Sequence, residues 1–273
     1  MFRVLSWLRK LRWRWRLLLI ALVVILIVVV IVPSAIYLSR ARKPPNYKTT
    51  PSEVTATYVV GYDSGDGVTN SGIFTLKVID TGLQKDSVTS FHVVTVFDSY
   101  PKRKVNAIIV GSAKVTIGAE EIWRSQSDLR LVHRKLMEMD LPMVNTAITE
   151  MPYTEYENYP GWPYHLNDSW TYKIFHSTDV PLQPDWTDTF RADVVSDDAI
   201  IEIGGVEYPC FKVIHTLTAS TTGTLPGGGI GSTIIEYWNK SGRSIGPLKV
   251  ENSVSFRGTE TRIIIGTPPL LPF

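Results

Sequence analysis

The chain has 273 residues, a formal net charge of +2 and one cysteine, Cys210. Ten basic and no acidic residues fall within residues 1–48, which leaves eighteen basic and twenty-six acidic residues after them, a net charge of −8 (18 − 26). This acidic balance disfavours a nucleic-acid-binding surface. A lone cysteine can form neither an internal disulfide nor a thiolate metal site.

The N-terminal part contains one long apolar run. Leu17–Val32 is apolar throughout, and residues 33–38 extend the run to twenty-two residues without a charge. At about 1.5 Å per residue such a helix is about 33 Å long, enough to cross a hydrocarbon core of about 30 Å. We therefore expect a transmembrane helix at residues 17–38.

Three alternatives to this helix are a cleaved signal peptide, a buried core helix and a surface helix. Ser39-Arg40-Ala41 is similar to a cleavage site, but the apolar run exceeds the roughly 7–15 residues that signal peptides use. The run also lacks a polar face with which to lie on a membrane. An uncleaved anchor explains the pattern best.

The flanks of the run indicate its orientation. Six basic residues lie within residues 1–16, against four within residues 39–48. Positive charge favours the cytoplasmic side, so we expect a single-pass protein of the cell membrane. Its N-terminus is then cytoplasmic and its C-terminal domain extracytoplasmic. The partner of the N-terminal helix is membrane lipid. Residues 39–52, rich in proline and polar groups, predict an extended tether.

The chain then changes to short segments rich in β-branched and aromatic residues, separated by turns about every ten positions. Within a first β-rich half, residues 53–150, these segments predict antiparallel strands at Val54–Tyr62, Gly72–Ile79, Val88–Phe97 and Val105–Ile117. The segment Leu129–Asp140 fits the apolar spacing of a strand and of a helix. We favour a strand there.

An aromatic connection, residues 151–169, separates the two halves. It combines several prolines and glycines with tyrosines and tryptophans, so it cannot be a regular helix or strand throughout. Its rings could form a stacking platform for a sugar or an apolar ligand, or they could pin a long connection across the sheet. The prolines favour the second interpretation.

The second β-rich half, residues 170–266, again reads as strands, and residues 267–273 form a tail. Asp197-Asp198 and Gly204-Gly205 are predicted hairpin turns, and Cys210 is predicted to be a small buried side chain. The strands are expected at Trp170–Phe175, Trp186–Val195, Ala199–Ile203, Glu207–Leu217, Ser232–Trp238 and Leu248–Ile265. A weak internal echo, Glu121-Ile-Trp against Glu236-Tyr-Trp, leaves open whether the two halves are duplicates.

Three segments carry a resemblance to a known group of proteins. They are Asp168-Ser-Trp-Thr-Tyr, the run Gly205–Thr216, and Tyr237-Trp-Asn-Lys-Ser-Gly followed by Pro247-Leu-Lys-Val-Glu. This pattern, over residues 168 to about 256, resembles uncharacterised bacterial and archaeal envelope proteins that are similar to the lipoprotein-carrier (LolA-like) half-barrels. The resemblance implies a curved antiparallel sheet wrapped around apolar contents, and it suggests a carrier function.

The expected fold class is therefore all-β: a curved antiparallel half-barrel, as one sheet or as two similar halves, preceded by one transmembrane helix. Catalytic motifs are lacking in the sequence. The five histidines show no HExxH or other close metal-ligand spacing, and no G-x-S-x-G segment occurs. We predict no enzymatic activity, no catalytic residues, no metal and no cofactor.

Two functions remain. The first is non-catalytic binding of an apolar ligand, a lipid or a lipoprotein acyl chain, since an incompletely closed sheet must be filled. The ligand-binding candidates are Trp123, Trp170, Tyr172, Phe211, Tyr237 and Trp238. The alternative is a structural or interaction protein of the cell envelope with a self-filled core, which would contact a protein partner through Tyr156, Tyr159 and Trp162.

Overall fold

The structure is a computed structural model. It describes residues 54–63, 69–99, 102–107, 111–141, 145–180, 183–221, 233–254 and 258–268. The basic segment at 1–16, the expected transmembrane helix at 17–38 and the tether at 39–52 lie outside the described residues, as does the tail from 269.

Among the described residues, no helix has the length and apolar character needed to span a bilayer.

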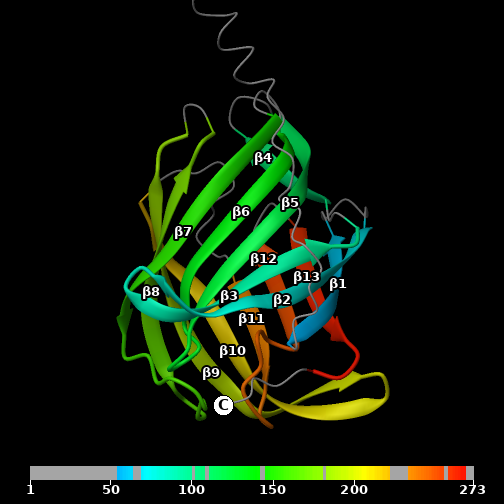
Figure 1. Cartoon of the computed structure of the whole chain (residues 1–273), viewed down its shortest axis with the longest axis vertical. Coiled ribbons are helices and arrows are strands. Elements are labelled where there is room, and N and C mark those ends of the chain that lie inside the picture. The colour runs from blue at the N-terminus through cyan, green and yellow to red at the C-terminus, as the bar shows by residue number, and fades with distance from the viewer. Residues whose placement is uncertain are drawn as a thin grey trace, which may run out of the picture.

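The described chain is built of thirteen strands (Figure 1). The first seven are β1 (Thr55–Asp63), β2 (Thr69–Lys85), β3 (Val88–Phe97), β4 (Lys102–Ala107), β5 (Gly111–Ser125), β6 (Leu131–Leu141) and β7 (Asn145–Glu157). The other six are β8 (Ser169–Thr178), β9 (Trp186–Ile203), β10 (Val206–Ser220), β11 (Thr233–Asn239), β12 (Lys249–Val254) and β13 (Gly258–Ile265).

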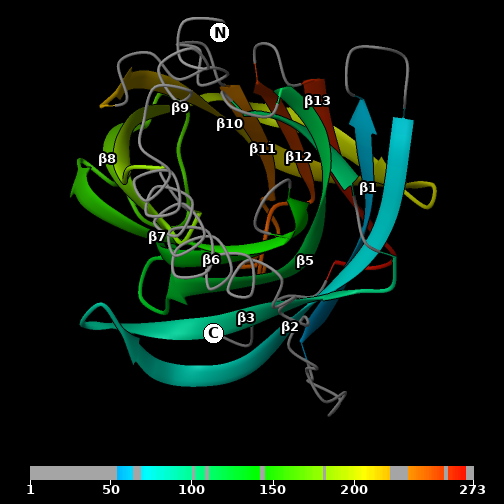
Figure 2. The ribbon, with the colours of Figure 1, turned by 90° about the horizontal axis from the view of Figure 1, so that it is seen from above.

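The sheet closes on itself. Its strand order is β3-β2-β1-β13-β12-β11-β10-β9-β8-β7-β6-β5-β4, all antiparallel where neighbours pair, and β3 also pairs with β5. The long strand β5 makes both contacts: Gly111–Thr116 pairs with β4, and Glu120–Ser125 pairs with β3. Twelve strands therefore form a closed barrel, which Figure 2 shows from above. Among the described strands β4 pairs only with β5 and is not part of the ring.

The expected half-barrel is therefore wrong. Residues from both predicted halves contribute to one closed sheet, and the pairing of β3 with β5 is what closes it. Hairpins such as β9–β10 are signalled by local turn residues. Closure depends instead on residues 25 to 35 positions apart, for example Ser90 opposite Ser125 and Thr95 opposite Glu120, and no local pattern encodes that register.

Several predicted elements are confirmed. The ambiguous segment is a strand, β6, and Cys210 is buried at 0% exposure. Gly204 and Gly205 form the β9–β10 hairpin turn with φ of 59° and 81°. The predicted hairpin at Asp197-Asp198 is wrong, because β9 runs through these residues and absorbs them at an irregularity in its register with β10.

The barrel interior holds two apolar clusters. The first lies along β1, β2 and β3, and includes Leu129, Ile245 and Leu248 from connections between strands. The second lies along β8 to β11, and includes Trp170 and Trp238. Leu129 belongs to the β5–β6 connection, and Ile245 and Leu248 to the β11–β12 connection. Because neighbouring strands are antiparallel, both connections leave the sheet at the same end of the barrel.

The predicted aromatic connection begins within a strand, because residues 151–157 belong to β7. Its remainder, residues 158–168, lies at that end too, and its rings pack into the barrel. Tyr159 donates a hydrogen bond to the carbonyl oxygen of Asp128 (3.1 Å). Tyr164 stacks on Trp170 with ring centroids 5.4 Å apart, and Trp162 lies 5.8 Å from the ring of Phe211. These contacts agree with a connection pinned by its own rings, and they plug this end of the barrel.

Truncating the plug should cost stability. Tyr164 is 6% exposed, so Tyr164→Ala should lower the free energy of unfolding by about 3 kcal/mol, as large-to-small changes of buried aromatic residues do. Leu166→Ala, in the same connection but 46% exposed, should change it by less than about 0.5 kcal/mol. Urea titration of the full chain in detergent, followed by tryptophan fluorescence, measures both. Equal effects would show that the plug does not stabilise the barrel.

Candidate functional site

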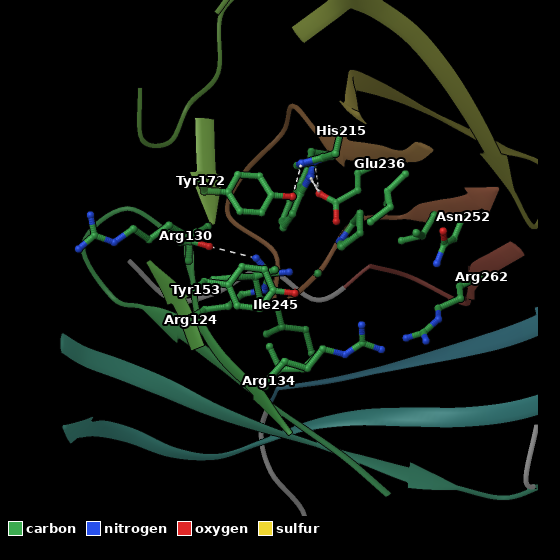
Figure 3. Close-up of a pocket in the computed structure, with 18 of the residues that line it drawn as sticks. Arg124, Arg130, Arg134, Tyr153, Tyr172, His215, Glu236, Ile245, Asn252 and Arg262 are labelled. Atoms are coloured by element: carbon green, nitrogen blue, oxygen red, sulfur yellow. Dashed lines mark hydrogen bonds and ion pairs between the residues drawn. The ribbon is translucent and has the colours of Figure 1, made fainter. Parts of the chain in front are cut away.

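A cavity of about 180 Å³ lies inside the barrel, between the two apolar clusters. Its floor is the plugged end, because Leu129, Tyr159, Tyr164 and Ile245 all line it. Its walls are both aromatic and charged (Figure 3). The aromatic lining is Tyr58, Phe74, Tyr153, Tyr156, Trp170, Tyr172 and Trp238, and the ionisable lining is Glu120, Arg124, Arg130, Arg134, His215, Glu236 and Arg262.

Glu120 is the centre of the first charged group. It lies on β5 and is 2% exposed. Its carboxylate is 2.5 Å from an Nη of Arg134 on β6 and 3.1 Å from Nη1 of Arg262 on β13. The hydroxyl of Thr95 lies 3.4 Å away. Since β1, β2 and β3 separate β13 from β5 in the strand order, the Arg262 contact ties distant strands together across the interior.

The two arginines keep Glu120 ionised. Burial would raise the pKa of its carboxyl, but the charges and hydrogen bonds of Arg134 and Arg262 outweigh burial and lower the pKa from 4.5 to about 2. The carboxylate is therefore a fixed negative charge at neutral pH.

The second charged group joins β8, β10 and β11. The phenol oxygen of Tyr172 lies 3.0 Å from Nδ1 of His215, and Nε2 of His215 lies 3.4 Å from the carboxylate of Glu236. Trp238 donates its indole N–H to the same carboxylate (2.8 Å). Burial raises the pKa of Glu236, but His215, Arg124 and the Trp238 hydrogen bond outweigh it and lower the pKa to about 2. Burial, as the largest cause, raises the pKa of Tyr172 well above its ordinary value.

Arg124 is the least compensated charge of the lining. Its side chain is 93% buried, with 7% exposed. Its guanidinium lies 5.0 Å from the ring of Trp238, and Nη1 donates to the carbonyl oxygen of Leu129 (3.1 Å). Nε has no hydrogen-bond partner, and no carboxylate oxygen within the described ranges lies within 4.0 Å of the guanidinium.

Four of the six predicted ligand-binding residues face the interior. Trp170, Tyr172 and Trp238 line the cavity, and Phe211 belongs to the second apolar cluster and packs against Trp162. Tyr237 does not face the cavity, because it lies between Glu236 and Trp238 on β11 and successive side chains of a strand point to opposite faces. The sequence prediction had placed adjacent residues on one face.

Trp123 also points away from the cavity, since Glu120, Ile122 and Arg124 of the same strand line it. It stacks on His92 with centroids 4.4 Å apart and meets His133 edge-on at 5.3 Å. His133 in turn lies between the carboxylates of Asp86 (2.9 Å) and Glu150 (2.7 Å). In the described ranges, no group of three or more His, Cys, Asp or Glu side chains is arranged to hold a metal ion.

The predicted partner-contact residues pack into the barrel. Tyr156 donates its hydroxyl hydrogen to the carbonyl oxygen of Leu131 (2.9 Å), and it stacks on Tyr172 with centroids 5.4 Å apart. Tyr159 and Tyr156 both line the cavity, and Trp162 packs on the second apolar cluster. These three side chains therefore build the interior of the described barrel.

The sequence prediction did not include the charged lining. These residues are Glu120, Arg124, Arg134, His215, Glu236 and Arg262. A signal was present, because successive side chains of a strand alternate between its two faces and charged residues occur within predicted strands, as Glu236 and Arg262 do. Alternation alone does not say which face is the inner one, and charges are ordinarily assigned to the solvent face.

The comparisons with known proteins add little to this geometry. No protein-family model matches the chain, and no curated protein is significantly similar to it. A solved structure from Bacteroides fragilis, assigned as an exported protein with a YmcC-like fold, aligns with 78% of this chain and 95% of its own, at 13% identity and a TM-score of 0.37. That score is too low to carry an argument about fold or function, and nothing in these comparisons names a LolA-like protein.

The buried carboxylates should make stability depend on acidity. A folded-state pKa of about 2 for Glu120, below its ordinary 4.5, stabilises the fold above about pH 4.5, and this contribution is lost as the pH falls towards 2. The loss should be about 3 kcal/mol for this group. Urea titrations between pH 7 and pH 2 measure it.

The matched variants are Glu120→Gln and Glu155→Gln, the second at a carboxylate that is exposed to solvent. Glu120→Gln should lower stability at pH 7, because Arg134 and Arg262 lose their buried partner, and should flatten the acid profile. Glu155→Gln should leave the profile of the wild type unchanged. A Glu120→Gln profile as steep as that of the wild type would contradict the assignment.

Proposed function

We propose that the barrel is a non-catalytic binding module that takes a small ligand into its interior. The observation that carries the proposal is the cavity of about 180 Å³ whose lining combines stacked aromatic rings with buried, ionised side chains. Ligand sites typically combine an apolar lining with a few convergent polar groups. A core that served only to stabilise the barrel would gain little from such charges, because burying them is costly.

The lining favours a compact ligand with polar groups over the acyl chain expected from the sequence. An acyl chain placed against Glu120, Arg124 and Glu236 would displace water from ionised groups without replacing its hydrogen bonds, and each such loss costs several kcal/mol. A ligand with hydrogen-bonding groups avoids that cost and still stacks on the tyrosines.

The proposal also places the module at a membrane. It rests on the apolar run at residues 17–38 and on the excess of positive charge before it. The barrel would then lie on the extracytoplasmic side, joined to the anchor by residues 39–52.

A bound ligand should accompany the purified protein. Native mass spectrometry of the full chain in detergent should show a mass above that of the denatured chain. Asn252→Trp should abolish the excess, because Asn252 lines the cavity and a tryptophan there would fill it. Glu251→Trp is the control, since Glu251 is the neighbouring residue on β12 and points to the opposite face. Retention of the excess mass in Asn252→Trp would exclude the barrel interior as the binding site.

Anchoring is tested separately. The full chain should remain in the membrane pellet after alkaline extraction, and protease added to intact spheroplasts should digest the barrel. A chain lacking residues 1–38 should leave the pellet, because it has lost its apolar run. A barrel that resists protease in intact spheroplasts but is digested after lysis would reverse the proposed orientation.

A self-filled scaffold of the envelope is the second candidate. The plug favours it, since the aromatic connection occupies much of the interior, and so do exposed apolar side chains on the β9–β10 hairpin: Ile200 is 59% exposed and Val206 52%. The mass measurement discriminates between the two functions. A chain without bound ligand, whose stability Asn252→Trp leaves unchanged or improves, would favour the scaffold.

A further inference from the structure

We infer that the ligand of the barrel cavity is an anion, and that Arg124 binds its negative group. This inference rests on the proposed function and specifies the chemistry of the same site.

The charges of the arginines and glutamates that line the cavity do not cancel. Arg124, Arg134 and Arg262 contribute three positive charges, because arginine stays protonated in proteins. Glu120 and Glu236 contribute two negative charges, since both pKa values are lowered to about 2. The sum is +1 (3 − 2) before any charge on His215 is counted. Arg130 also borders the cavity, but its guanidinium lies 3.6 Å from the carboxylate of Asp128 and is left out of the sum.

The excess charge belongs to Arg124. Arg134 and Arg262 share the carboxylate of Glu120. Glu236 is bound by His215 and by the indole N–H of Trp238. Arg124 has a carbonyl oxygen and the face of an indole ring, which stabilise a cation without neutralising it. Arg124 and Glu236 attract one another at longer range, but no carboxylate of the described residues contacts the Arg124 guanidinium. Burying a guanidinium without a contacting carboxylate is costly, and an anion is a partner that removes this cost.

Arg124 also has a free donor. Its Nε is buried and has no hydrogen-bond partner in the described structure, although buried N–H groups are nearly always paired. An N–H donor in a positively charged side chain makes its strongest hydrogen bond with an ionised oxygen, and the guanidinium fork suits a carboxylate or a phosphate. The unused donor and the excess charge therefore lie on one side chain.

Two further polar groups of the cavity are unused. The hydroxyl of Tyr153 and the side-chain amide of Asn252 both belong to lining residues, and neither makes a hydrogen bond to another described residue. Figure 3 shows Arg124, Tyr153 and Asn252 around the cavity. Burial raises the pKa of Tyr153, and Arg134 and, to a smaller extent, Arg124 partly offset it. Tyr153 and Asn252 therefore offer further hydrogen-bonding groups to a ligand in the cavity that Arg124 lines.

The body of the ligand must be compact and flat-faced. The cavity holds about 180 Å³, and Tyr172 stacks with Tyr153 (5.9 Å) and Tyr156 (5.4 Å) on its wall. Aromatic rings pack well against another ring or against the face of a sugar. The ligand class is therefore a small aromatic or sugar acid.

The experiment compares anions with neutral molecules of the same size. Titration calorimetry of the full chain in detergent, in a buffer free of carboxylates and phosphate, uses two pairs of probes: benzoate with benzamide, and glucuronate with glucose. We expect at least one anion to bind at least tenfold more tightly than its neutral counterpart. Equal affinities within both pairs, or tighter binding of the neutral members, would overturn the inference.

Two variants locate the anion. Arg124→Gln, which removes the charge and keeps a similar length, should weaken binding of the anion at least tenfold. Arg191→Gln is the control, because Arg191 is exposed on β9 and pairs with Asp193, and it should bind as the wild type does. Unchanged binding by a folded Arg124→Gln would overturn the assignment to Arg124. If this variant does not fold, the wild-type comparison of anions and neutral probes decides alone.

The outcome also separates this inference from the proposed function. A neutral ligand released from the purified chain and lost in Asn252→Trp would leave interior binding intact and would refute the anion. Absence of a co-purified ligand together with absence of probe binding would refute both.

Discussion

Closure of the sheet between β3 and β5 is the constraint on which the other features depend. Closure creates an enclosed interior, and side chains that point into this interior from different strands come into contact. β5 carries Glu120, Ile122 and Arg124 towards the interior and Trp123 away from it. β5 pairs with β6 on one side and with β3 on the other. Glu120 on β5 therefore contacts Arg134 on the neighbouring strand β6, and across the interior it contacts Arg262 on β13. Had the sheet stayed open, these groups would face water and would need no partners.

The interior combines apolar packing with a polar network. The two apolar clusters and the aromatic plug contribute the burial that stabilises the fold. Glu120 and Glu236 are each held by several donors, and their low pKa values reflect those donors rather than exposure to solvent. A fully paired network rigidifies a core. Several buried polar atoms of this network lack a hydrogen-bond partner within the described structure, among them Nε of Arg124 and Nε2 of His215.

The sequence predicts the elements of this fold better than their assembly. Periodicity and turn residues indicate most strands, the turn at Gly204-Gly205 and the burial of Cys210. They fail at Asp197-Asp198, where two acidic residues that resemble a turn are absorbed within β9. For the site, the sequence places six aromatic residues on an inner face; Trp170, Tyr172 and Trp238 line the cavity, whereas Trp123 and Tyr237 do not. The charged residues of the lining are not expected inside. Burying a carboxylate such as Glu120 is costly unless arginines contact it, and here these arginines come from strands distant in the sequence.

The thirteenth strand has a consequence of its own. β4 pairs with β5 along one side and ends the strand order, so among the described strands its other side carries backbone donors and acceptors that no strand takes up. A free side of this kind invites extension by a strand from another molecule. The sequence of β4 begins Lys102-Arg103-Lys104, and basic residues on an edge strand are a common protection against such pairing. An identical copy would bring the same basic sequence to this edge, which disfavours pairing of β4 with β4 of a second molecule.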